Sequence, residues 1–218
     1  NRVEGDLEIK VEMEGDVVSR AWSTGTMFRG FENIMAGRAA LDGLVITPRI
    51  CGICSTAHLA AAAAALDMIA GVEPPPGARM VRNVAQITEL LQSDMRQSFL
   101  TFMADSVNPV YRESRLADEA ARRYRPFRGE TVKSVIQATR NLLEIVAILG
   151  GQWPHSSYMV PGGIASLPSA RDLLLCKQTA AFFRDWYEER ILGCSLERWR
   201  EVTSLAALEE WLAESPAH

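Results

Sequence analysis

Two thiols three residues apart give this chain its clearest chemical potential. Cys51 and Cys54 form a Cys-x-x-Cys motif, with Arg49 two residues before the first thiol and His58 four residues after the second. Such a motif can direct both sulfurs at one soft metal ion. Gly52 between them favours the backbone turn that this requires. The spacing therefore predicts either a thiolate metal site or a redox dithiol.

Three roles for the two thiols can be weighed on the sequence. They could be ordinary thiols near a turn. A structural zinc site needs four ligands, and the isolated Cys176 and Cys194 form no second Cys-x-x-Cys pair. A thioredoxin-like dithiol is expected at a helix N-terminus that follows a strand in a βαβ unit, and the surrounding sequence does not indicate one. The flanking residues favour a narrower kind of metal site.

The composition limits the class of protein. The 218 residues suffice for one ordinary domain, and 48% hydrophobic with 23% charged residues is typical of a globular chain. A net charge of −4 without a basic run argues against nucleic-acid binding. Four cysteines in this pattern do not suggest a disulfide framework. The chain is expected to hold reduced thiols or thiolates on a metal.

Three carboxylates are further candidates for chemistry. Glu4 precedes the first predicted strand, and Glu32 follows Phe31 in a short glycine-containing segment. Asp94 lies seven residues after Ile87 and three after Leu91, which places it on an apolar helical stripe. A carboxylate buried there would be costly unless it is paired or functional. Asp94 is therefore expected to have a specific role, whereas surface positions would explain the other two.

The predicted elements are mostly helices. Alternating residues over 7–12, a turn at Gly15-Asp16 and a return over 17–24 predict a hairpin. Helices are predicted over about 58–70, 77–104, 130–149, from Ser169 to about 189, and 204–213. In the second of these, the apolar stripe is expected to face the core. The predicted fold class is α+β, mainly α: a long-helix bundle with a small N-terminal β-sheet.

Several motifs together resemble the large subunit of nickel–iron hydrogenases. The most specific is Arg-Ile-Cys-Gly-Ile-Cys-x-x-x-His over residues 49–58. The others are Arg-Val-Glu-Gly-Asp-Leu (2–7), Phe-Arg-Gly-Phe-Glu (28–32), Gly-Gly-Gln-Trp-Pro-His (150–155) and Val-Pro-Gly-Gly (160–163). Their order and spacing agree with the family along most of the chain. The resemblance implies reversible heterolytic cleavage of H2 to protons and electrons.

The resemblance also implies roles for individual residues. Cys51 and Cys54 would be nickel ligands, Cys54 also bridging to iron, and His58 would hydrogen-bond the bridging thiolate. Glu4 would accept the proton, since a carboxylate near a thiolate can relay one. Asp94 would lie near the open side of the metals, and Arg49 belongs to the same catalytic set. Glu32 would be a ligand of a magnesium-type ion, for which a hard oxygen is suited.

The implied cofactors and partners extend beyond these residues. The resemblance implies a NiFe centre with CO and cyanide ligands on iron, Mg²⁺ or a similar divalent ion, and Fe–S clusters in an iron–sulfur small subunit. The family's second Cys-x-x-Cys pair does not occur in the 218 residues. Residues 1–218 are therefore expected to be the N-terminal part of a large-subunit domain, completed by a second polypeptide or left as a fragment of a longer subunit. A non-catalytic hydrogen sensor, a metal-binding scaffold and a degenerate relative are the alternatives.

The sequence contains no predicted membrane span. The longest apolar run, residues 59–66, is mostly alanine and far shorter than the roughly 18 residues that a spanning helix needs. No basic segment followed by an apolar one occurs at the start of the sequence. The chain is expected to be cytoplasmic, or associated with a membrane through its partners.

Overall fold

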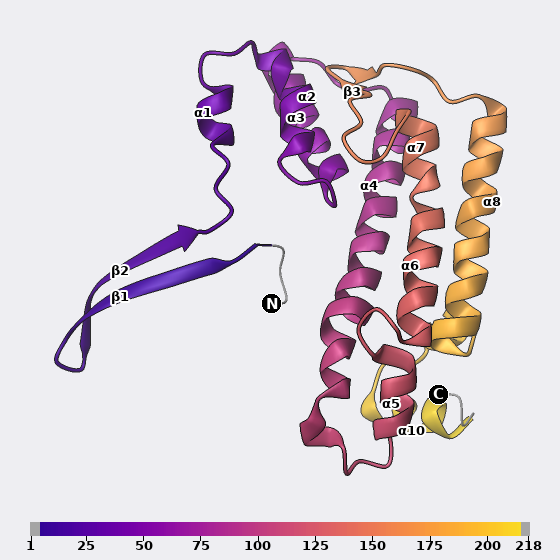
Figure 1. Ribbon diagram of the computed structural model, residues 1–218. Helices are drawn as coiled ribbons and strands as arrows, with labels where there is room; N and C mark the ends of the chain where they lie inside the picture. The colour runs from indigo at the N-terminus through magenta and orange to yellow at the C-terminus, as the bar shows by residue number, and fades with distance from the viewer. Residues whose placement is uncertain (1–4, 215–218) are drawn as a thin grey trace.

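The computed structural model describes residues 5–214 and shows a helical bundle from which a β-hairpin projects (Figure 1). The hairpin strands are β1 (Leu7–Glu14) and β2 (Val17–Gly25), and a second, minimal hairpin is formed by β3 (Met159–Val160) and β4 (Gly163–Ile164). The helices are α1 (Phe31–Met35), α2 (Gly43–Ile46), α3 (Ser55–Ala70), α4 (Pro76–Arg96), α5 (Ala117–Tyr124), α6 (Glu130–Leu142), α7 (Glu144–Gly150), α8 (Ala170–Tyr187), α9 (Leu196–Arg200) and α10 (Leu205–Glu214). The predicted fold class is confirmed.

The N-terminal hairpin forms where the alternating pattern predicts it. Its strands pair antiparallel from Leu7 opposite Gly25 to Glu14 opposite Val17, with a register irregularity between Glu12 and Met13. Gly15 occupies the tight turn with a positive φ of 62°, which favours glycine. Both faces of the hairpin are exposed in the described chain. A two-stranded ribbon of this kind is marginally stable by itself, so a partner surface is expected to support it.

The long helices begin and end close to the predicted positions. Helix α3 ends at Gly71, whose φ of 64° is left-handed, and α8 opens with the predicted Ser169–Asp172 capping box. The helix predicted over 77–104 continues from α4 into a π-helical turn, Gln97–Phe102, and a 3₁₀ segment, Met103–Val107. The helix predicted over 130–149 divides at Leu143 into α6 and α7.

The core lies among α3, α4, α6, α7 and α8. Its most buried side chains include Leu59, Ala85, Val135, Val146 and Met159. Helix α4 lies between α3 on one side and α6 and α7 on the other, and contacts all three (Figure 1). The orientation of α4 therefore decides which of its side chains face the segment that contains the cysteines.

The predicted orientation of α4 is wrong over most of its length. Of the apolar stripe expected to face the core, Met80, Val84, Ile87 and Leu91 are exposed in the described chain, whereas Met95 near the end of α4 is buried as predicted. The buried face instead includes Arg82, Glu89 and Gln92. Polar residues occupy the inner face because each of the first two has specific partners there, described below. The outer apolar stripe has the character of an interaction surface.

A buried ion pair joins α3, α4 and the β3–β4 hairpin. Arg82 Nη1 donates to Asp67 Oδ2 at 2.6 Å, and the Arg82 guanidinium also donates to the carbonyl oxygens of Val160, at 2.6 Å, and Gly163, at 2.8 Å. The Gly162 amide donates to Asp67 Oδ1 at 2.7 Å. The pair is therefore fully hydrogen-bonded, as a buried pair of charges requires.

This pair makes acid stability depend on Asp67. The hydrogen bond from Arg82 lowers the pKa of Asp67 below its ordinary value of 3.8. Its stabilisation is therefore fully present above pH 3.8 and is lost as the pH falls through the lower pKa of the folded state. We expect acid unfolding, followed by circular dichroism, to depend less steeply on pH below this value in Asp67→Asn than in wild type. Identical pH slopes would contradict this account.

Candidate metal centre

The two thiols of the Cys-x-x-Cys motif converge at the start of α3. A short 3₁₀ helix, Thr47–Arg49, contains the buried Pro48 and leads into the turn at Cys51. The backbone amide of Cys54 donates to Cys51 Sγ at 3.4 Å, and Cys54 is the N-cap residue of α3. Both cysteines are half-buried and neither forms a disulfide. The arrangement gives one ion access to two sulfur donors.

The surroundings of Cys54 hold its proton on the sulfur. The pKa of Cys54 is raised from 9.0 to about 12. Burial of the thiol is the largest cause, and a hydrogen bond with Cys51 and the negative charges of Cys51 and Glu89 add to it. A coordinated cation has the opposite effect, because it stabilises the thiolate directly. Metal binding at this turn would therefore release a proton.

The turn is packed against the segment after α7. Ring atom Nδ1 of His155 lies 2.9 Å from the carbonyl oxygen of Pro48, and the His155 amide donates to Ser55 Oγ at 3.3 Å. A Cβ on Gly52 would lie 3.5 Å from Cε1 of the His155 ring. That distance is an ordinary van der Waals contact, so the His155 ring packs directly against the middle of the motif.

Glu89 of α4 is a site residue that the sequence analysis missed. Its side chain is 4% exposed, and its carboxylate accepts hydrogen bonds from the Thr56 and Ala57 amides at 3.0 Å each. Trp153 Nε1 donates to the same carboxylate at 3.0 Å. The signal in the sequence is its position two helical turns after Arg82, on the face of α4 opposite the apolar stripe. A polar face at that spacing is typical of a solvent-exposed surface, so the sequence alone does not single out Glu89.

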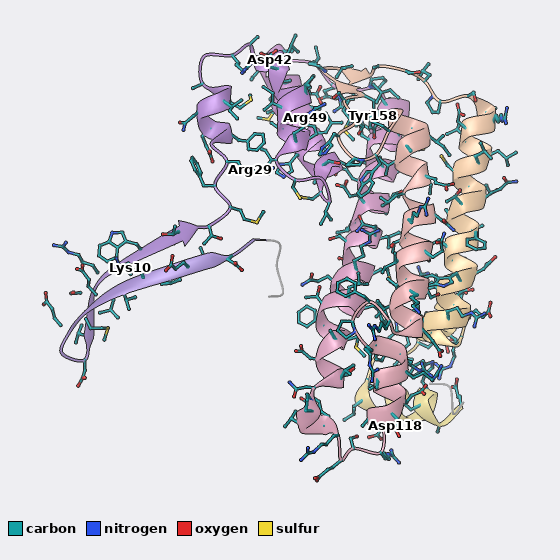
Figure 2. All side chains as sticks on the ribbon, viewed as in Figure 1. Lys10, Arg29, Asp42, Arg49, Asp118 and Tyr158 are labelled. Atoms are coloured by element: carbon teal, nitrogen blue, oxygen red, sulfur yellow. The ribbon has the colours of Figure 1, made fainter. Side chains whose placement is uncertain are left out.

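Two of the predicted site residues, His58 and Arg49, lie near the cysteine turn. Neither side chain forms a hydrogen bond with a thiol in the described structure. His58 is half-buried one helical turn after Cys54, and its amide donates to the Cys54 carbonyl oxygen at 3.3 Å. Arg49 is exposed, and its guanidinium donates to the Val45 carbonyl oxygen. In Figure 2, Arg49 and Tyr158 lie at the same end of the bundle.

Of the three predicted carboxylates, the two within the described residues are not grouped with the thiols. Glu32 is exposed in the first turn of α1. Asp94 lies on the apolar stripe of α4, as predicted, but the stripe is exposed, so the expectation that this carboxylate is buried is wrong for the described chain. Glu4 lies outside the described residues.

Arg29 connects the Phe-Arg-Gly-Phe-Glu segment to the cysteine turn. Its guanidinium donates to the carbonyl oxygen of Ile50, the residue before Cys51, and lies 4.9 Å from the centre of the Phe31 ring. Figure 2 shows Arg29 between α1 and the strand that precedes it. This hydrogen bond, from the Arg29 side chain to a backbone carbonyl, attaches the segment that contains Glu32 to the cysteine turn.

The donor set fits part of a metal site. Among residues 5–214, no group of three or more His, Cys, Asp or Glu side chains is placed to hold a metal ion. The two convergent sulfurs suit a soft or borderline ion, and further ligands would have to come from elsewhere.

None of the helices within residues 5–214 combines the length and the hydrophobicity that a membrane-spanning helix requires.

The fold and site define a helical protein that can contribute two thiolates to a shared metal centre. The family model described as nickel-dependent hydrogenase matches residues 29–108. The periplasmic [NiFeSe] hydrogenase large subunit of Desulfomicrobium baculatum is 34% identical over 183 residues, which cover 78% of this chain and 36% of that protein. The hydrogenase-2 large chain of Escherichia coli (strain K12) is 41% identical over 83 residues, which cover 38% of this chain and 15% of that protein.

Solved structures agree with these sequence matches. The reduced, active Ni-Fe-Se hydrogenase from Desulfomicrobium baculatum matches with a TM-score of 0.69 and 30% identity, covering 88% of this chain and 42% of that one. The Ni-Fe-Se hydrogenase from D. vulgaris Hildenborough in the reduced state gives 0.69 and 28%, covering 88% and 41%. The chain belongs to the nickel-dependent hydrogenase family and corresponds to the N-terminal part of its large subunit. The chain spans 36% of the length of the first of these relatives.

Proposed function

We propose that this chain is the N-terminal portion of a [NiFe] hydrogenase large subunit that catalyses reversible heterolytic cleavage of H2 to protons and electrons. The observation that carries the proposal is the convergence of Cys51 and Cys54 at the N-terminus of α3. Nickel and iron, the iron with CO and cyanide ligands, would supply the site at which H2 is cleaved. The remaining nickel ligands would come from a part of the large subunit outside these 218 residues.

The residues of this chain then have separate tasks. Cys51 and Cys54 would hold nickel, and Cys54 would also be a ligand of iron. His58 orients the Cys54 sulfur from one helical turn away, and Glu4 accepts a proton from that sulfur. Arg49 contributes a polar group beside the reacting site. Asp94 would lie near the open side of the metals in the complete site, although it is exposed and not grouped with the thiols within residues 5–214. Glu32 would be a ligand of Mg²⁺ or a similar ion. Each of these roles is proposed from the family's motifs.

The proposal extends to the assembly. An iron–sulfur small subunit would carry the electrons away, because the described residues include no cluster of four cysteines. The exposed apolar stripe of α4 and the unsupported β1–β2 hairpin would be covered by the rest of the complex. Attachment to a membrane, where it occurs, would be through a partner.

The metal content of the complex purified from its native source tests the function. We expect about one nickel per copy of this chain, with iron in excess because the small subunit contributes clusters. Plasma mass spectrometry of the intact complex gives both values. Zinc alone, or no metal, would contradict the proposal.

A further inference from the structure

Helix α3, which follows the cysteine turn, has no N-terminal cap of its own. Its N-cap residue is Cys54, and no side-chain hydrogen bond from that residue caps the helix. The first amides of a helix have no partner within it and need acceptors from elsewhere. Ser55 and Thr56 are almost completely buried, with 1% and 0% exposure, so water does not serve this purpose readily.

Glu89 of the neighbouring helix supplies the missing acceptors. Its two oxygens divide the work: Oε2 accepts from the Thr56 amide and Oε1 from the Ala57 amide, each at 3.0 Å. A carboxylate at this position also complements the positive end of the helix dipole. The cap is therefore provided by α4, across 32 and 33 residues of sequence.

The same carboxylate binds the segment that covers the turn. Trp153 Nε1 donates to Oε2 at 3.0 Å, and Ser55 Oγ lies 3.5 Å from the same oxygen. Ser55 Oγ in turn accepts from the His155 amide, and the His155 ring packs against Gly52. Glu89 is thus the one acidic side chain that joins α3, α4 and residues 153–155 around the cysteine turn in the described structure.

We propose that Glu89 is a positioning residue for the metal-binding thiols. By fixing the Thr56 and Ala57 amides, Glu89 restrains the first turn of α3 and with it Cys54, two residues before Thr56. The Cys54 amide in turn donates to the Cys51 sulfur. This inference rests on the proposed function, because the positioned sulfurs are the proposed nickel ligands. It assigns a role to a residue that bears no metal-ligating contact itself.

The test is Glu89→Gln in the complete complex. Glutamine keeps the shape and one acceptor oxygen, but turns an NH₂ group toward one of the two amides. Asp67→Asn is the control for lost stability, since it replaces a buried carboxylate near the C-terminal end of α3 by a neutral amide. Glu73→Gln, in the exposed loop between α3 and α4, is the surface control. Three quantities are measured in each variant. They are the hydrogen-exchange rates of the Thr56 and Ala57 amides, the nickel bound per chain at limiting nickel, and the alkylation rates of Cys51 and Cys54.

We expect Glu89→Gln to accelerate exchange of the two amides about tenfold, as for loss of a hydrogen bond to a charged group. Nickel content at limiting nickel should fall about tenfold, which is the lower range for groups that orient metal ligands. Both controls should retain wild-type nickel content and alkylation rates. Equal nickel loss in Asp67→Asn, or wild-type nickel and exchange in Glu89→Gln, would overturn the proposal.

Failure of the proposed function would look different. The wild-type complex would then contain no nickel, whereas failure of the positioning role leaves nickel in the wild type and in Glu89→Gln alike. In a nickel-free wild type, the alkylation rates still decide the role of Glu89. A change of several-fold at Cys51 and Cys54 in Glu89→Gln alone supports positioning, and unchanged rates exclude it.

Discussion

Replacing Cys54 by serine is expected to remove nickel and hydrogen turnover together. A serine hydroxyl is a hard donor that stays protonated near neutral pH, so it does not replace a thiolate on a soft metal ion. Cys54 also sits at the junction of the turn and α3, where its sulfur shares the site with Cys51. Nickel per chain and H2 oxidation by the purified complex, assayed with an artificial electron acceptor, are the two measurements.

Cys194→Ser provides the matched control for this substitution. Cys194 Sγ accepts a hydrogen bond from Trp211 Nε1 at 3.2 Å, and a serine oxygen can accept the same bond. This variant should retain its nickel and its turnover. Near-stoichiometric nickel in Cys54→Ser would show that this sulfur is not a ligand.

Replacing Arg82 by methionine is expected to cause the largest loss of stability from one substitution. The change leaves Asp67 as an uncompensated charge, and removing one partner of a buried pair typically costs about 3–5 kcal/mol. It also leaves the carbonyl oxygens of Val160 and Gly163 without their donor. Thermal unfolding of the complex by circular dichroism should show a clear fall in the transition midpoint.

Arg184→Met is the comparison at the surface. Arg184 of α8 pairs with Glu188 and Glu197 at an exposed position, and such pairs contribute about 0–1 kcal/mol. The double variant Asp67→Asn with Arg82→Met should lose less stability than the sum of the two single variants, because the partners no longer leave each other unpaired. Equal effects of Arg82→Met and Arg184→Met would refute the importance of the buried pair.

Local patterns in the sequence predicted the β1–β2 hairpin and the longer helices, but not the shorter elements such as α1, α5 and the β3–β4 hairpin. Strict alternation gave the β1–β2 hairpin, the capping box at Ser169 gave the start of α8, and Gly71 gave the end of α3. These signals are properties of neighbouring residues, so they need no knowledge of the remaining chain. The cysteine turn was predicted for the same reason, since its spacing is local.

The faces of α4 could not be predicted in this way. An apolar stripe indicates which side of a helix is covered, but not by which part of the protein. Here Met80 and Ile87 are exposed in the described chain, while Arg82 and Glu89 are buried by partners 15 and 33 residues distant. Such pairings depend on tertiary contacts, which periodicity does not reveal. The same limit hid Glu89 and gave Asp94 the wrong burial.

Helix α3 is held to α4 at both of its ends. Glu89 binds its first amides, and Arg82 binds Asp67 near its last turn. These two attachments on one face of α4 resist sliding and tilting of α3 relative to α4. The apolar stripe lies on the opposite face of α4. A subunit that docks on the stripe would therefore press directly on the helix that binds the first amides of α3.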